Sequence, residues 1–374
     1  MQPLGPEVLP PGIRARIVEG VNGLDLHLLE AGYEAPGRPL VLLLHGFPEL
    51  AYSWRKVMPA LAAAGYHAVA PDQRGYGRTT GWSDVYEQDL RPFSMLALVR
   101  DQLALLRALG RSRAAAVVGH DFGSPVAAWA ALVRPDVFPA AVLMSAPFAG
   151  APVPGQGLDW QALDRALAAL PRPRKHYQRY YATAEAHRDM LHCAQGVHAF
   201  LRAYFHHKSA DWAGNRPHRL AAWRAEALAE LPTYYVMDLA RNMAATVAPE
   251  MPGAAEIATC RWLTEDELAV YSGEFARTGF QGGLNWYRTR FEPALIDELT
   301  LFAGRRIEVP SMFIAGKSDW GVYQSPGDFE RMQEQACPAM TGCHLLDGAG
   351  HWVQQEQADR VAGLLLDFLR EAAG

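Results

Sequence analysis

Residues 117–123 read Val-Val-Gly-His-Asp-Phe-Gly, and this stretch gives the first indication of the fold. It overlaps an apolar run at 114–118 and precedes a helical pattern, so it joins a buried strand to a helix. Gly119 and Gly123 permit a turn that is too sharp for larger side chains. Such a turn carries the central Asp121 out over the edge of a sheet, where the helix N-terminus favours its ionised form.

A G-x-D-x-G stretch is weak evidence when it stands alone, because an aspartate that caps an ordinary helix gives the same pattern. The surrounding sequence strengthens it. Short apolar runs alternate with helical patterns on both sides, which indicates an α/β protein with a mostly parallel sheet flanked by helices. We expect strands at 13–18, 24–29, 40–44, 67–70, 114–118 and 140–144, with helices at 52–64 and 93–109 and a third helix that ends at Val133.

The alternation stops at residues 146–154, which are rich in Pro, Gly and Ala. From Leu158 to about Thr300 no buried strand is predicted, and the spacing of Ala, Leu and aromatic residues is helical. Strand patterns return at 311–315 and 343–346, and an amphipathic helix at 358–370 closes the chain. We therefore predict a core domain formed by residues 1–148 and 304–374, interrupted by a helical lid domain at residues 149–303.

Composition limits the function classes. The 374 residues carry a net charge of -5, and no basic cluster suits nucleic acid or a membrane surface. The four cysteines and the pair His206–His207 match no metal-ligand spacing, so we expect neither metal nor cofactor. No signal-peptide or membrane-spanning pattern is present, which predicts a cytoplasmic protein with reduced thiols. An oligomer is compatible with this composition.

Three more polar groups follow predicted strands. Asp319 and His351 come after the last two, which gives the chain order nucleophile, acid, histidine. Asp319 would fix the tautomer of His351, and His351 would act as a base. The segment 45–49 follows the strand at 40–44, and there the backbone N–H of Phe47 is expected to form an oxyanion hole.

The N–H of Phe122, directly after the nucleophile, is the second expected oxyanion donor. Pro48 has no N–H to offer, and a cis bond before it would stiffen the loop.

An aspartate in the nucleophile position indicates a particular electrophile. A serine that attacked a saturated carbon would form a stable ether, whereas the carboxylate of Asp121 would form an alkyl ester. Water activated by His351 can hydrolyse that ester by attacking the carbonyl carbon of Asp121. The substrate is therefore expected to be an epoxide or a carbon that bears a halide.

From about Val18 to Leu369 the chain resembles the epoxide hydrolases of the α/β-hydrolase superfamily. The resemblance is carried by segments 45–49, 52–55, 72–77, 119–123, 176–180, 279–288 and 350–352, and by Asp319. It implies an α/β-hydrolase fold with an inserted lid, and a small-molecule epoxide as the partner. It also maps two ring-opening tyrosines onto Tyr287 and Tyr177, with Tyr180 and Tyr181 as neighbours that could replace Tyr177. Two phenols would hydrogen-bond the ring oxygen and supply its proton.

Two alternatives stay open: a haloalkane dehalogenase with the same triad, and a hydrolase-fold protein that binds a ligand without turnover. The family often has Trp after the nucleophile, and Phe122 lacks the indole N–H with which dehalogenases bind halide. We expect substrate contacts from Trp352, Trp286, Gln178 and Pro48. Three further matching residues are interpreted as structural: Glu49, Trp54 and Arg74.

Overall fold

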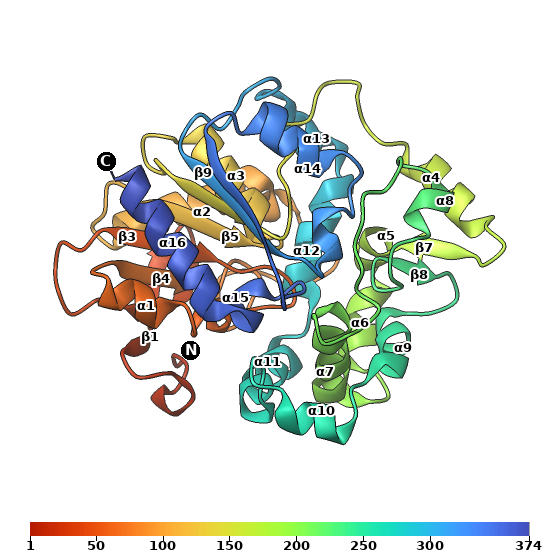
Figure 1. Cartoon of the computed structure of the whole chain (residues 1–374), viewed down its shortest axis with the longest axis horizontal. Coiled ribbons are helices and arrows are strands. Elements are labelled where there is room, and N and C mark those ends of the chain that lie inside the picture. Colours follow the sequence, from red (N-terminus) through yellow and green to blue (C-terminus); the bar gives the residue numbers. More distant parts are fainter. Residues whose placement is uncertain (374) are drawn as a thin grey trace.

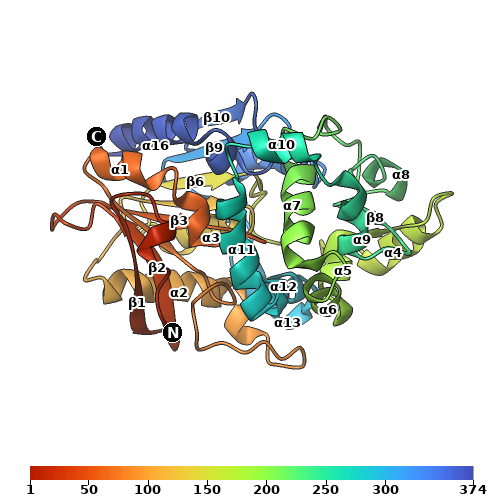
Figure 2. The ribbon, with the colours of Figure 1, turned by 90° about the horizontal axis from the view of Figure 1, so that it is seen from below.

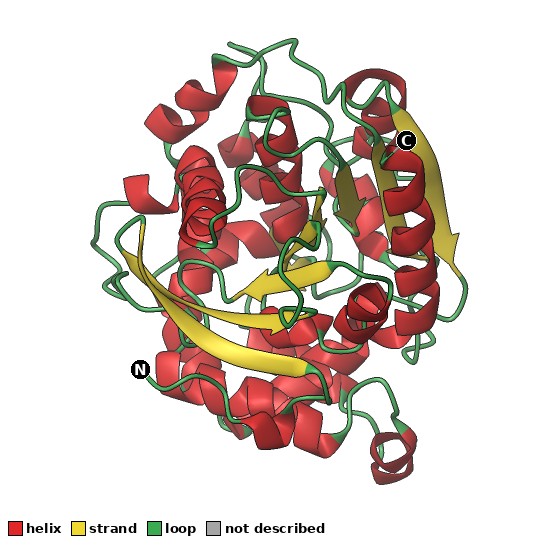
Figure 3. Ribbon diagram, turned by 90° about the vertical axis from the view of Figure 1, so that its left-hand side faces the viewer, coloured by secondary structure: helices red, strands yellow, loops and turns green. Residues whose placement is uncertain are grey.

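The computed structural model describes residues 1–373, and an eight-stranded sheet forms its centre (Figures 1 and 3). The strand order is β1-β2-β4-β3-β5-β6-β9-β10. Strands β1, β2 and β4 pair antiparallel, and every pair from β4 to β10 is parallel. The strands are β1 (Ile13–Val21), β2 (Leu24–Ala31), β3 (Leu40–Leu44), β4 (His67–Pro71), β5 (Ala116–His120), β6 (Ala141–Met144), β9 (Ser311–Gly316) and β10 (Met340–Leu346).

Helices cover both faces of this sheet, which is why its central strands are apolar throughout. All residues of β3, β5 and β6 are buried. α1 (Met58–Ala63) packs with α16 (Ala358–Ala372) on one face, and α2 (Met95–Ala108) packs with α3 (Gly123–Val133) on the other (Figure 2). The short helices α14 (Asp328–Arg331) and α15 (Val353–Glu356) follow β9 and β10. The predicted parallel sheet with flanking helices is confirmed.

One predicted core helix is wrong in its extent. Residues 52–64 were expected to form a single helix, but the structure has a 3₁₀ turn at Ala51–Trp54 and then α1. Pro59 stands in the first turn of α1, where a missing N–H costs nothing, so a new helix begins there. Every residue of the 3₁₀ turn is buried, so its apolar residues give the same sequence pattern as the buried face of a helix.

The chain between β6 and β9 is mainly helical and lies beside the sheet, to the right in Figure 1. Its helices are α4 (Trp160–Ala168), α5 (Tyr177–Tyr181), α6 (Glu185–Leu191), α7 (Gly196–Lys208), α8 (Ala225–Leu228), α9 (Met243–Val247), α10 (Ala254–Thr259), α11 (Glu265–Thr278), α12 (Gln281–Arg288) and α13 (Pro293–Thr300). The sequence predicts no buried strand in this stretch, and that prediction is wrong. β7 (Arg174–His176) pairs antiparallel with β8 (Val236–Asp238), and three-residue strands are too short to show a period.

Candidate active site

The turn between β5 and α3 has the sharpness that its sequence predicts. Asp121 adopts φ = 51°, a left-handed conformation that is uncommon outside glycine. A Cβ atom on Gly119 would lie 1.9 Å from the carbonyl oxygen of Gly123. A Cβ atom on Gly123 would lie 2.3 Å from the carbonyl oxygen of Leu44 in β3. Both glycines are therefore required for the elbow to pack against the neighbouring strand.

Three loops at the carboxyl ends of β5, β9 and β10 bring the predicted triad together. His351 Nδ1 lies 3.0 Å from Asp319 Oδ1, and His351 Nε2 lies 3.3 Å from Asp121 Oδ2. The first contact is a hydrogen bond, whereas Nε2 has no partner in hydrogen-bond geometry. The side chains of His351 and Asp319 are each 1% exposed, and that of Asp121 retains 12%. Of the three, the nucleophile alone keeps accessible surface.

Both carboxylates of the triad are held ionised. Burial by itself would raise the pKa of Asp121, but contact with His351 and the positive charges of Lys208 and His120 bring it below its ordinary value. Burial likewise favours a higher pKa for Asp319, but His351 and the hydrogen bonds that the carboxylate accepts lower it. An ionised Asp121 is the form that can attack carbon.

One oxyanion donor is in place. The backbone N–H of Phe47 donates to Asp121 Oδ1 at 2.9 Å, and the peptide bond between Phe47 and Pro48 is cis. Phe122 directly precedes α3, and within residues 1–373 its N–H donates no hydrogen bond. Its assignment as the second donor stays a prediction.

The two lid tyrosines named from the sequence lie over this turn. Tyr177 begins α5 and Tyr287 belongs to α12, yet their ring centroids are 5.9 Å apart. The ring of Tyr287 lies 5.1 Å from that of Phe122 and 5.6 Å from that of Phe47. Burial, and then the negative charge of Asp121, raise the pKa of both tyrosines. Both phenols are therefore protonated, and their role as donors to the ring oxygen stays a prediction.

The neighbouring tyrosines that could have replaced Tyr177 are engaged elsewhere. The hydroxyl of Tyr180 donates to Asp189 Oδ2 at 3.0 Å, and the hydroxyl of Tyr181 donates to Tyr204 Oη at 3.2 Å. Of these three tyrosines in α5, Tyr177 is the one whose pKa the charge of Asp121 helps to raise, which agrees with its assignment; the assignment itself stays a prediction.

Comparison with known proteins places this geometry in a family. Residues 39–358 match the family model described as alpha/beta hydrolase fold. Epoxide hydrolase A of Mycobacterium tuberculosis is 35% identical over 372 residues, which cover 95% of this chain and 96% of that protein. The chain belongs to the epoxide hydrolase family.

Solved structures agree with the sequence relatives. An epoxide hydrolase from an endophytic Streptomyces superposes with a TM-score of 0.77 at 34% identity, covering 96% of each chain. Epoxide hydrolase A from Mycobacterium thermoresistibile gives a TM-score of 0.74 at 33% identity, covering 96% of this chain and 98% of that one. The α/β-hydrolase fold expected from the sequence is thereby confirmed.

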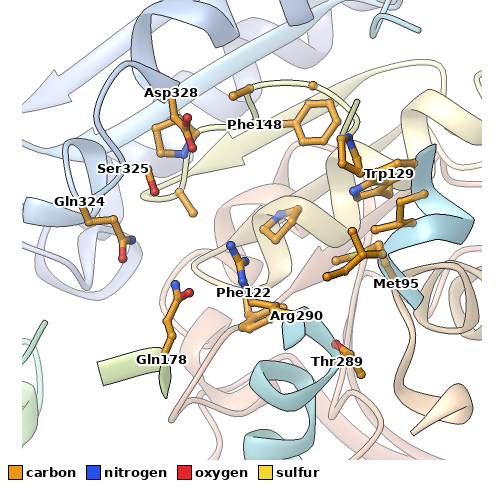
Figure 4. Close-up of a pocket in the computed structure, with 18 of the residues that line it drawn as sticks. Met95, Phe122, Trp129, Phe148, Gln178, Thr289, Arg290, Gln324, Ser325 and Asp328 are labelled. Carbon is orange, nitrogen blue, oxygen red and sulfur yellow. The ribbon is translucent and has the colours of Figure 1, made fainter. Parts of the chain in front are cut away.

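A cavity of about 340 Å³ opens between the sheet domain and the lid of this epoxide hydrolase (Figure 4). Gln178 and Gln324 lie on one side of it and Met95 and Trp129 on the other, with Phe122 between them. Most of its lining is apolar, which suits a small apolar ligand. The remaining lining residues are Pro125, Ala146, Pro147, Phe148, Ala149, Gly150, Pro152, Thr289, Arg290, Leu295, Ile296, Leu299, Gly321, Ser325 and Asp328.

Two residues that line this cavity are hydrogen-bonded to a predicted catalytic residue. The hydroxyl of Tyr177 donates to Gln324 Oε1 at 3.0 Å and accepts from Gln178 Nε2 at 3.2 Å. Asp121 itself does not line the cavity. The Tyr177–Gln324 hydrogen bond therefore connects a predicted catalytic residue to the wall of the cavity.

The other predicted substrate contacts lie outside this cavity. Trp352 and Trp286 are completely buried, and their indole N–H groups donate to the carbonyl oxygens of Phe205 and Arg74. Trp352 packs against the ring of His351 at 4.6 Å, and Pro48 is also buried. A substrate role for these three stays a prediction, whereas Gln178 does line the cavity.

Sequence reasoning missed Ser145. This residue follows β6 with φ = 68°, and its Oγ lies 2.5 Å from Asp319 Oδ2 and 2.8 Å from His351 Nδ1. It thus bridges the acid and the base of the triad. No motif marks it, although its position at the end of a central strand is a usable signal.

A buried ion pair beside the nucleophile was also missed. His120 Nδ1 lies 2.6 Å from Glu49 Oε2, and His120 Nε2 lies 2.7 Å from the carbonyl oxygen of His351. Burial by itself would lower the pKa of His120, but the charge of Glu49 brings it above its ordinary value. Glu49 also accepts from Gln354 and Gln355, so its predicted role in ordering a loop fits the structure.

Arg74 and Trp54 have the structural roles expected from the sequence. Arg74 pairs with Asp101 at 2.8 Å, and Trp54 is fully buried, as expected of residues that hold the fold. Among residues 1–373 no cluster of three metal-ligating side chains occurs. Across the same residues no helix has the length and apolar character needed to cross a membrane.

Proposed function

We propose that this chain opens an epoxide to a vicinal diol through a covalent alkyl ester on Asp121. The observation that carries the proposal is the proximity of two protonated lid phenols, Tyr177 and Tyr287, whose rings lie 5.9 Å apart and whose pKa values the charge of Asp121 helps to raise. The relatives described above are named epoxide hydrolases, which supports the same reaction.

In the first half-reaction a carboxylate oxygen of Asp121 attacks a ring carbon, and the bond from that carbon to the ring oxygen breaks. The electron pair of this bond moves to the oxygen, where Tyr177 and Tyr287 donate hydrogen bonds and one of them gives its proton. An alkoxide is a stronger base than a phenolate, so transfer is favourable even from a tyrosine whose pKa is raised. Water later restores the phenolic proton.

In the second half-reaction His351 removes a proton from water, and the hydroxide attacks the carbonyl carbon of Asp121. The N–H of Phe47, with that of Phe122, stabilises the negative oxygen of the tetrahedral intermediate. Asp319 stabilises the imidazolium. When the intermediate collapses, the diol oxygen takes the proton from His351 and Asp121 is free again.

The contacts of the lid favour epoxide chemistry over halide chemistry. A departing halide needs N–H donors and no proton. Phe122 has no such donor in its side chain, and the indole N–H of its neighbour Trp286 donates to the carbonyl oxygen of Arg74. The assembled triad likewise disfavours a protein that only binds its ligand.

We further propose a detoxification role. Three statements made from the sequence stay predictions: a cytoplasmic location, an oligomeric state, and the division into a core at 1–148 and 304–374 and a lid at 149–303. The mostly apolar cavity suits an epoxide with an apolar body, without fixing its length or its polar substituents.

Oxygen-18 labelling tests the covalent route. With enzyme in excess over a styrene-type epoxide in labelled water, the first turnover should place the label in the peptide that contains Asp121. The diol should become labelled only in later turnovers, because its first oxygen comes from the carboxylate. Label that entered the diol directly would mean that water attacks the epoxide, and parallel release of halide from bromoalkanes would favour the dehalogenase alternative.

A further inference from the structure

Lys208, the last residue of α7, is a buried cation whose charge helps to keep Asp121 ionised but which has no contact with substrate in the proposed reaction. The residue is 3% exposed, and among residues 1–373 its ammonium donates no hydrogen bond and has no carboxylate within ion-pair distance. Burying an ammonium group without a partner is unfavourable. A buried lysine at this position therefore requires a compensating interaction, either within the protein or with a ligand.

Aromatic rings supply part of that compensation. The Nζ atom lies 4.9 Å from the ring centroid of Tyr235, 5.4 Å from those of Tyr204 and Trp352, and 5.7 Å from that of Tyr234. Ring faces attract a cation but accept no conventional hydrogen bond. The three N–H groups of Lys208 thus remain available to an oxygen acceptor.

The aromatic residue whose ring lies nearest this ammonium carries a second unpartnered donor. The hydroxyl of Tyr235 is buried and has no hydrogen-bond partner. The ring of Tyr235 packs 5.0 Å from that of Tyr177, and its carbonyl oxygen accepts the backbone N–H of Tyr177 at 2.8 Å. Tyr235 therefore contacts both Lys208 and one of the proposed ring-opening tyrosines.

The same cation is tied to the catalytic loop. The carbonyl oxygen of Lys208 accepts the backbone N–H of His351 at 2.8 Å. Burial lowers the pKa of Lys208, and the negative charges of Asp121 and Asp319 oppose that fall. The ammonium thus interacts electrostatically with Asp121, although the two groups form no ion pair.

We propose that Lys208 and Tyr235 form a subsite for a carboxylate that the substrate carries close to its epoxide ring. This inference rests on the proposed function and names the substrate class as epoxy acids. An ammonium and a phenol, both free to donate, match an anionic oxygen better than a hydrocarbon group, which would leave both donors unpaired. Because Tyr235 contacts both Tyr177 and Lys208, a carboxylate near the epoxide ring is the arrangement that the subsite would accept.

Three probes of similar shape test the subsite: trans-3-phenylglycidate, its primary amide, and trans-1-phenylpropylene oxide. Wild type should open the glycidate with the highest kcat/KM. Lys208→Met should lower that value by about tenfold or more relative to the other two probes, as expected for a lost charge-assisted hydrogen bond. Lys208→Arg should retain most of the preference, and Tyr235→Phe should weaken it severalfold.

Lys175→Met is the matched control, since Lys175 also lies 4.9 Å from a lid tyrosine ring, that of Tyr180. It should leave the substrate preference unchanged. Equal slowing of all three probes by Lys208→Met, or a wild type without preference for the glycidate, would overturn the subsite while the proposed function stood.

If no probe were opened, the proposed function would fail. Calorimetry with the unreactive 3-phenylpropanoate would then decide the subsite: binding that depends on Lys208 supports it, and binding that survives Lys208→Met, or no binding, overturns it.

Discussion

The hydroxyl of Tyr177 donates its hydrogen to Gln324 Oε1 at 3.0 Å, so the phenol that we propose for ring opening already has an acceptor within the protein. In the proposed reaction the epoxide oxygen replaces Gln324 as this acceptor. Gln324 also lines the cavity, so the exchange would take place at the cavity wall.

Gln324→Leu should therefore tighten substrate binding. A neutral hydrogen bond contributes about 1 kcal/mol net, which corresponds to a fall in KM of about fivefold with kcat nearly unchanged. Steady-state kinetics with a styrene-type epoxide measures both. Gln333→Leu is the control, because Gln333 donates to the carbonyl oxygen of Phe329 and does not line the cavity. A higher KM, or a fall in kcat, would mean that Gln324 positions Tyr177 instead of competing with the substrate.

The two lid phenols should share the work of ring opening. Tyr177→Phe and Tyr287→Phe should each slow alkylation of Asp121 by about tenfold or more, because the second phenol remains, and the double change should cost far more. Stopped-flow fluorescence of the tryptophans in single turnovers measures that step. Circular dichroism checks the fold of each variant. A double variant that alkylated at the wild-type rate would remove the main support for epoxide chemistry.

The parts of this site that the sequence predicted are those with a local pattern. The run Leu40–Leu44, the glycines around Asp121, and the positions of Asp319 and His351 after strands depend on a few consecutive residues. Hydrophobic period and turn chemistry act over such short stretches, so they can be read without knowledge of the packing.

The parts that were missed depend on long-range packing. Gln324 meets Tyr177 across 147 residues, and Ser145 reaches Asp319 across 174. The surroundings of the Lys208 ammonium depend on packing too: Tyr204 precedes it by one turn of α7, but Tyr234, Tyr235 and Trp352 come from two distant segments. No property of the residues next to them in sequence predicts these contacts.

The base can be separated from the nucleophile by one substitution. His351→Gln keeps Asp121 and the lid phenols, so the enzyme should still form the ester but fail to hydrolyse it. Mass spectrometry should find an adduct equal to the mass of the epoxide on the peptide that contains Asp121. Asp121→Ala supplies the control, because it has no carboxylate to alkylate. Loss of activity without an adduct would place His351 before ester formation or make it a structural residue.

A buried carboxylate outside the catalytic triad should contribute to the stability of the fold. Glu30 in β2 pairs with Arg14 and Arg16 of β1 and contacts His67. Burial by itself would raise the pKa of Glu30, but His67, Arg16 and Arg14 bring it from 4.5 to about 2.

Because the folded state holds this proton more weakly than the unfolded state, the ionised Glu30 stabilises the fold above pH 4.5. That contribution is lost as the pH falls from 4.5 towards 2. Glu30→Gln should therefore lower the free energy of unfolding by about 1–3 kcal/mol at pH 7, less than the full shift implies because the two arginines are partly exposed.

Urea denaturation at pH 7 and at pH 3 measures this difference, which should shrink at the lower pH. Glu19→Gln, an exposed change in the same hairpin, should have little effect at either pH. A difference for Glu30→Gln that persisted unchanged at pH 3 would show that the side chain stabilises the sheet through packing and neutral hydrogen bonds, and not through its charge.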